Sequence, residues 1–327
     1  MVKFMKKVVC LLVVLIMSVT SVEAKEFTNV KEKMLLSVME KYFSSMITSL
    51  YHGDIHEHSD ALAKTITIID YIETLEASNY CMHALGGIDG HYYTNSIEAL
   101  KQSYAQGYRI YEADVRLTSD GYPVLVHDWK KNDYIKRIQE DWYLNVLSDE
   151  NQNYVPNLET FMNFKIQKNY TATSFDMLVE FMQEHTDMYV LVDAGYAGYE
   201  ETYALYEGIL RVCQDKSVLN RLITGGHTIG SVEAQQEQYQ FPIINMYYAQ
   251  KDIKEYEFGT DEEWIDYCKE VGATSYSTAY ETYIQNEDNH LKESGLYTYV
   301  FTVDDEIIAT NCLERGADII GTNFIRK

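Results

Sequence analysis

Between residues 80 and 325, short β-rich runs alternate with segments whose apolar positions recur at helical spacing. Three early runs end at His83, Asp114 and His127, and a helix is predicted between the first two, from Asn95 to Gly107. Five later strands are predicted at Met188–Asp193, Leu222–Gly225, Ile243–Tyr248, Thr274–Thr278 and Tyr297–Val303. Four later helices are predicted at Ser174–His185, Glu200–Cys213, Asp261–Val271 and Asp305–Arg315. Eight strands with helices between them predict an α/β fold, a (β/α)8 TIM barrel in one domain.

Two regions lie outside this alternation. Residues 25–78 contain Val30–Leu50 and Ala61–Leu75, which both have helical periodicity, so we expect an N-terminal helical extension packed on a barrel of residues 79–327. Residues 129–173 form a long connection that leaves one of the early strands. Connections of that length usually carry function, and this one is predicted to be a cap-like insertion over the pocket.

Residues 1–24 have the pattern of a secretory signal peptide. A front with Lys3, Lys6 and Lys7 precedes an apolar run from Val8 to Val19, and Ala24 follows as a small residue. The run is too short for a transmembrane span. We therefore expect a secreted or cell-envelope protein. Its formal net charge of −23 disfavours nucleic acid and anionic membranes as partners.

The run that begins at Ile110 carries the first candidate chemistry. Alternate side chains of a strand point the same way, so Glu112, Asp114 and Arg116 share one face. Two carboxylates so placed repel each other unless a cation lies between them, and carboxylate oxygens suit Ca²⁺ or Mg²⁺. His83 and His127 end the neighbouring runs, and imidazoles exchange protons near neutral pH. The alternative is a structural salt bridge to Arg116 with both histidines packed in the core.

Several short motifs occur in a fixed order: His83-Ala-Leu-Gly86, Asn95-Ser96, Glu112-Ala-Asp114, Thr118-Ser-Asp-Gly121, His127-Asp128, Thr298 to Asp305, and Gly316 to Asn323. Their order and spacing resemble the glycerophosphodiester phosphodiesterase family. That family belongs to a superfamily that also contains phosphatidylinositol-specific phospholipase C and sphingomyelinase D enzymes. The resemblance extends over most of the chain, which makes it far more specific than a single short motif.

The resemblance implies a metal-dependent phosphodiester hydrolase. One divalent cation, Ca²⁺ or Mg²⁺, would be held by Glu112, Asp114 and Asp193. His83 would act as the base and His127 as the acid, on a small phosphodiester or a lipid head group.

The chain departs from the family at two positions. Ala84 and Gly195 stand where the family has an Arg and a Lys, so two cations that would hold an anionic substrate are missing. We expect Arg116 to supply part of that charge. His227 and Phe301 fall at other strand ends, and they are expected to line the substrate-binding pocket.

Two alternatives to glycerophosphodiester hydrolysis stay open. The carboxylate at Asp193 also matches the sphingomyelinase D branch, which favours a phospholipase-like enzyme on zwitterionic lipids with a transient membrane contact. The loss of the two family cations favours a catalytically decayed barrel that binds a metal and a ligand. The leaving group, the preferred metal and the oligomeric state do not follow from the sequence.

Overall fold

The computed structural model describes residues 55–138, 146–148, 152–195, 197–249, 258–285, 291 and 294–326. The predicted signal peptide and the predicted helix Val30–Leu50 lie outside the described residues. Within the described ranges, no helix combines the length and the apolar character that crossing a bilayer requires.

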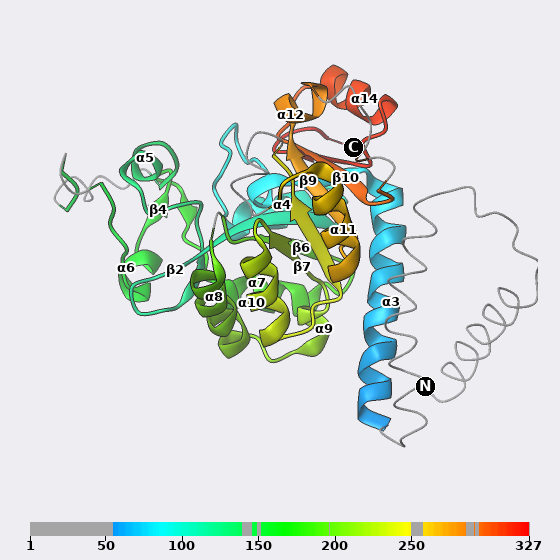
Figure 1. Cartoon of the computed structure of the whole chain (residues 1–327). Coiled ribbons are helices and arrows are strands. Elements are labelled where there is room, and N and C mark those ends of the chain that lie inside the picture. Colours follow the sequence, from blue (N-terminus) through cyan, green and yellow to red (C-terminus); the bar gives the residue numbers. More distant parts are fainter. Residues whose placement is uncertain are drawn as a thin grey trace, which may run out of the picture.

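Eight parallel strands close into a barrel, which confirms the predicted fold (Figure 1). In chain order they are β1 (Tyr80–Met82), β2 (Ile110–Leu117), β6 (Tyr189–Asp193), β7 (Leu222–Gly226), β8 (Ile243–Tyr247), β9 (Ser275–Ala279), β10 (Tyr297–Phe301) and β11 (Ile319–Thr322). The ring closes because β1 pairs in parallel with β11 on one side and with β2 on the other.

The strand predicted to end at His127 is not one of the eight. Residues Pro123–Leu125 form β3, which pairs antiparallel with β2 and lies outside the ring. The eighth barrel strand is β11, close to the C-terminus. His127 therefore follows the second strand of a hairpin and reaches the site from beside β2.

The five helices predicted within the barrel are confirmed to within two residues at each end, whereas the helix predicted at Ala61–Leu75 is longer in the structure, Ile55–Ser78. Those between barrel strands, or after them, are α4 (Ile97–Ala105), α7 (Phe175–Glu184), α8 (Tyr199–Val212), α11 (Asp261–Val271) and α14 (Glu306–Glu314). The structure adds helices that the apolar spacing did not reveal: α9 (Lys216–Leu219), α10 (Ile229–Gln238) and α12 (Tyr280–Gln285). Helix α10 was missed because it is mostly polar, so its apolar positions form no clear stripe.

Strand β2 shows how alternation sorts side chains between the two layers. Tyr111, Ala113 and Val115 face outward and pack with apolar residues of α7 and α8. Ile110 lies on the other face, inside the barrel, as do the carboxylates that follow it at every second position. The same strand thus contributes to the outer core and to the lining of the barrel.

Helix α3 (Ile55–Ser78) covers one end of the barrel. Its buried side chains Ile68, Tyr71 and Leu75 join a cluster with inward-facing strand residues such as Ile110 and Ile223. Figure 1 shows α3 on one side of the barrel and the elements of residues 129–173 on the opposite side. The apolar cluster that α3 forms with the strands therefore lies away from the strand ends that carry the polar side chains.

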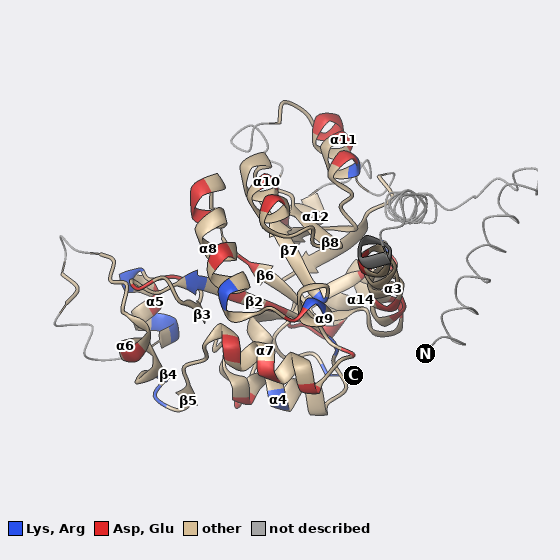
Figure 2. Ribbon diagram, turned by 90° about the horizontal axis from the view of Figure 1, so that it is seen from below, with Lys and Arg blue, Asp and Glu red and all other residues tan. Residues whose placement is uncertain are grey.

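The described parts of residues 129–173 pack in an apolar cluster that includes Trp129, Tyr134 and Phe161 and extends to Ala99 of α4 and Val124 of β3. The described elements of this insertion are α5 (Lys131–Asp133), a π-helical turn (Tyr134–Ile138), α6 (Leu158–Met162), β4 (Lys165–Ile166) and β5 (Tyr170–Thr171). Figure 2 shows several basic residues on this insertion, whereas acidic residues mark outer helices such as α8 and α11. Over residues 129–173 six Lys or Arg residues balance six Asp or Glu residues, so the insertion is close to neutral in an acidic protein.

The packing of α3 against the barrel predicts that substitutions on its buried and exposed faces differ in their effect on the free energy of unfolding. Tyr71 is 1% exposed, so Tyr71→Ala should lower the free energy of unfolding by about 3 kcal/mol or more, the usual loss for a buried aromatic ring. Ile66 is 36% exposed on the same helix, and Ile66→Ala should change it by only about 0.5 kcal/mol. Urea unfolding measures both, and equal effects would show that α3 does not seal the barrel.

Candidate active site

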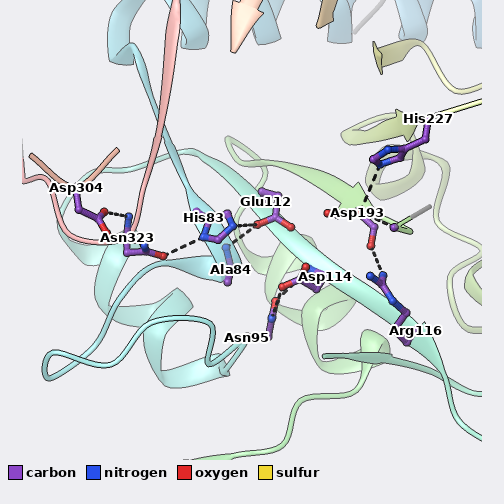
Figure 3. Close-up of polar contacts among 11 residues, drawn as sticks. His83, Ala84, Asn95, Glu112, Asp114, Arg116, Asp193, His227, Asp304 and Asn323 are labelled. Carbon is purple, nitrogen blue, oxygen red and sulfur yellow. Dashed lines mark hydrogen bonds and ion pairs between the residues drawn. The ribbon is translucent and has the colours of Figure 1, made fainter. Parts of the chain in front are cut away.

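Three carboxylates converge at the C-terminal ends of two neighbouring barrel strands (Figure 3). Glu112 and Asp114 come from β2, and Asp193 ends β6, where it is the register partner of Asp114. One oxygen of each carboxylate lies within 4.8 Å of the others. The sequence placed all three at strand ends, and the structure brings them together.

Local backbone geometry fixes Glu112 and Asp114. The amide of Ala84 donates to Glu112 Oε2 at 2.7 Å from a left-handed turn with φ 49°. Asn95 donates from Nδ2 to Asp114 Oδ2 at 2.8 Å, and its Oδ1 accepts from the Asp114 amide at 3.1 Å. Asn95 also has positive φ, which Asn tolerates better than most residues. Glu112 and Asp114 are therefore held by hydrogen bonds from residues on either side of the segment 86–94.

Asp193 lies beside an imidazole, a backbone amide and a guanidinium. His227 Nε2 lies 3.8 Å from its Oδ1, and the amide of Gly195 also donates to Oδ1. Arg116 donates to the backbone carbonyl of Asp193 at 2.8 Å. Burial opposes ionisation, but His227, Arg116 and the Gly195 amide outweigh it and hold the pKa of Asp193 well below its usual range. Asp193 is therefore an anion at neutral pH.

Glu112 has the opposite environment. Its burial, and then the charges of Asp114 and Asp193, raise its pKa well above the usual range. Its Oε1 is buried and has no hydrogen-bond partner among the described residues. A cation at this point would satisfy that oxygen and offset the repulsion among the three carboxylates. The donor set thus fits one divalent cation with oxygen preference.

A chain of hydrogen bonds orients His83, the first residue of a 3₁₀ turn after β1. Asn323 Oδ1 lies 3.0 Å from His83 Nδ1, and Asn323 Nδ2 donates to Asp304 Oδ2 at 2.8 Å. Because the Asp304 carboxylate only accepts, the amide oxygen of Asn323 must face the imidazole. Nδ1 of His83 therefore carries the proton, and Nε2 is left as an acceptor, 3.8 Å from Glu112 Oε2.

Tyr93 contacts both histidines that the sequence marked as catalytic. Its ring is 4.5 Å from the His83 ring and 5.3 Å from the His127 ring, centroid to centroid, edge-on in both cases. Burial, with the charges of Asp114 and Glu112, raises the pKa of Tyr93 to about 12. Its hydroxyl therefore keeps its proton at neutral pH and can donate.

All eight residues proposed from the sequence line one cavity of about 800 Å³ at this end of the barrel. They are His83, Glu112, Asp114, Arg116, His127, Asp193, His227 and Phe301. Tyr247 adds an aromatic ring 6.1 Å from that of Phe301. Sequence reasoning missed Tyr93, Asn95, Asp304 and Asn323 as positioning groups. For Asn95, Asp304 and Asn323 a signal existed, since all three lie within the motifs that carry the family resemblance.

A parallel eight-stranded barrel with carboxylates and imidazoles gathered at one end is the arrangement of a metal-assisted TIM-barrel enzyme. The chain belongs to the glycerophosphoryl diester phosphodiesterase family, whose model matches residues 87–327. It is therefore a phosphodiesterase, and the family membership supports glycerophosphodiesters as its substrates. None of the curated proteins is similar enough in sequence to match this chain.

Several solved structures share the fold. A protein of Silicibacter pomeroyi DSS-3, provisionally described as a glycerophosphoryl diester phosphodiesterase, is 13% identical with a TM-score of 0.60 over 78% of this chain and 94% of that chain. An Oleispira antarctica phosphodiesterase, solved with the product sn-glycerol-3-phosphate, is 15% identical with a TM-score of 0.57 over 75% and 92%. A glycerophosphodiester phosphodiesterase of Parabacteroides distasonis ATCC 8503 is 14% identical with a TM-score of 0.56 over 75% and 92%. At these identities the likeness shows the fold.

The carboxylate cluster predicts how the protein binds a metal. Glu112→Gln and Asp114→Asn should each weaken Ca²⁺ or Mg²⁺ binding more than about tenfold, because each removes an anionic ligand. Isothermal titration calorimetry measures the affinity. Asp128→Asn is the matched control, since Asp128 lines the same cavity but pairs with Lys130. Unchanged affinity in both cluster variants would remove the metal assignment.

Proposed function

We propose that this chain is an exported, metal-dependent hydrolase of glycerophosphodiesters that uses His83 and His127 as base and acid. The observation that carries the proposal is the convergence of two imidazoles and three carboxylates on one cavity. Export rests on the signal-peptide pattern of residues 1–24 alone. The family membership supports the reaction, and the site supports the division of roles.

The residues divide the chemistry between them. A divalent cation held by Glu112, Asp114 and Asp193 would supply a Lewis acid to a non-bridging phosphate oxygen and to a neighbouring glycerol hydroxyl. His83 accepts, at Nε2, the proton of that hydroxyl or of water while the oxygen attacks phosphorus. His127 gives a proton to the departing alkoxide as the P–O bond breaks. With water as the nucleophile, the products are glycerol phosphate and the free alcohol. With the glycerol hydroxyl as the nucleophile, the alcohol leaves a cyclic glycerophosphate, which water then opens to glycerol phosphate.

The assignment of His83 as the base comes from the family resemblance, and the tautomer of His83 is compatible with that role. With Nδ1 donating to Asn323, its Nε2 has a lone pair toward the carboxylate cluster. Tyr93 packs edge-on to both imidazoles and limits the orientations that they can adopt. The two imidazoles are thus already oriented in the absence of substrate.

Arg116 is the cation that we propose for the substrate phosphate. Its guanidinium lies over Gly195, where a Cβ would come within 2.7 Å of Nη2. Its Nη1 donates to the carbonyls of Val115 and Asp193, while Nη2 makes no hydrogen bond within the described part of the chain. The guanidinium of Arg116, from β2, thus occupies the space that a side chain at position 195 would fill. Planar guanidinium groups bind phosphate through paired hydrogen bonds.

Activity on a panel of diesters tests the proposal. Glycerophosphocholine, glycerophosphoethanolamine and sphingomyelin vesicles, each with and without Ca²⁺ or Mg²⁺, separate a glycerophosphodiester hydrolase from an enzyme on lipid head groups. We expect metal-dependent release of glycerol phosphate. His83→Ala and His127→Ala should each reduce kcat on the order of 10²- to 10⁴-fold, the range of general acid–base catalysis. A wild-type protein that is inert on the whole panel, yet binds metal, would favour the decayed barrel.

The position of Arg116 predicts an effect of adding one methyl group. Gly195→Ala should displace the guanidinium and weaken sn-glycerol-3-phosphate binding roughly tenfold, the effect of losing one charge-assisted hydrogen bond. Arg116→Ala should weaken it at least as much. Gly198→Ala is the control, because Gly198 has ordinary φ and a Cβ there meets nothing within 4 Å.

Gly195 has φ +67°, so its alanine variant also loses about 1 kcal/mol of stability from the left-handed backbone. Thermal unfolding separates that loss from the binding effect. Calorimetric titration with sn-glycerol-3-phosphate then decides the matter. Full affinity in both Gly195→Ala and Arg116→Ala would show that the phosphate is held elsewhere.

A further inference from the structure

The insertion contributes a buried carboxylate to the second histidine. Asp133 ends the short helix α5, and its side chain is 5% exposed. Its Oδ1 lies 3.0 Å from Nδ1 of His127. Arg137, one helical turn further along the insertion, contacts the same carboxylate oxygen and lies with its guanidinium 4.3 Å from the Tyr93 ring.

The protonation of this group follows from its partners. Burial opposes ionisation of Asp133, but its contacts with His127 and Arg137 lower its pKa below the usual range, so it is a carboxylate that only accepts. Nδ1 of His127 must then carry the proton, which leaves Nε2 as the other reactive nitrogen. Arg137 Nη1 also lies 3.1 Å from Nδ1 of His127. Both nitrogens then donate, and they share Oδ1 of Asp133 as their acceptor.

We propose that Asp133 is a positioning residue for His127, supplied by the insertion, and that Arg137 limits its effect by sharing its charge. The inference rests on the proposed role of His127 as the acid. Asp133 fixes the imidazole in the tautomer that presents Nε2 to the cavity, and it stabilises the imidazolium that must donate a proton to the alkoxide. Arg137 draws part of that stabilisation away.

The groups that face His127 come from three elements. Asp133 and Arg137 belong to the insertion, Asp114 to β2, and Tyr93 to the loop before α4. Burial lowers the pKa of His127, but the hydrogen bond to Asp133 and the charge of Asp114 raise it overall. A cation at the carboxylate cluster would neutralise Asp114. Asp133 is then the anion that continues to favour the protonated imidazole.

The pair predicts opposite shifts in two variants. An acid must be protonated to work, so activity is present below the pKa of His127 and is lost above it. Asp133→Asn removes the anion and should move the alkaline limb of the kcat profile to lower pH. Arg137→Leu removes the competing cation and should move that limb to higher pH. A merely structural role of the insertion gives no reason for opposite directions.

The experiment follows the His127 imidazole directly by NMR titration of the full chain, with its resonance assigned by its loss in His127→Gln. The same variants are then assayed for turnover on glycerophosphocholine. We expect Asp133→Asn to lower kcat on the order of 10- to 100-fold with little change in KM. Asp187→Asn is the matched control, because Asp187 also pairs with an arginine, Arg109, but does not line the cavity.

The titration separates this inference from the proposed function, since it needs no turnover. Opposite shifts in Asp133→Asn and Arg137→Leu support the pair even if no diester is cleaved, in which case the proposed function fails alone. An unmoved titration in both variants, or shifts in one direction, overturns the pair. If Asp133→Asn does not fold, the Arg137→Leu titration decides by itself: an upward shift supports the pair, and no shift or a downward shift overturns it.

Discussion

Repulsion among three buried carboxylates is the constraint on which this site depends. Glu112, Asp114 and Asp193 approach within 4.8 Å at a place where solvent screens their charges poorly. The surrounding loops place one backbone and one side-chain hydrogen-bond donor against these carboxylates. Ala84 and Asn95 both adopt left-handed φ, a strained conformation for residues other than glycine, and both thereby direct an N–H group at a carboxylate. Such donors orient the cluster without neutralising it, so the arrangement favours a divalent cation.

Arg116 introduces a second charge on the same strand as the carboxylates. It follows Asp114 by two residues, so strand geometry places its side chain on the same face of β2. Glycine at position 195 is what makes room for its guanidinium. A cation on β2 keeps a fixed relation to Glu112 and Asp114, whereas a lysine at position 195 would have depended on the loop after β6. The absence of a side chain at Gly195 is therefore part of this site and not merely a loss.

Local sequence predicted what depends on local periodicity. The alternation in β2 placed Glu112 and Asp114 on one face, and the parallel neighbour β6 brought Asp193 beside them. The strand count failed at β3, which was taken for a barrel strand in place of β11. Only residues 118–122 separate β2 from β3, and a parallel crossover needs about a dozen residues. The length of that connection, and not the apolar pattern, could have identified the hairpin.

The partners of the two histidines were not predictable in the same way. Asn323 lies 240 residues from His83, and nothing in either motif says that the closed barrel makes them neighbours. Asp133 lies only six residues from His127, but it is one charged residue among several in the insertion. Only the folded path of the chain through α5 brings the Asp133 carboxylate to the His127 imidazole. Because the carboxylates come from barrel strands and the partner of His127 from the insertion, changes in residues 129–173 can tune His127, the proposed acid, while leaving the proposed metal ligands in place.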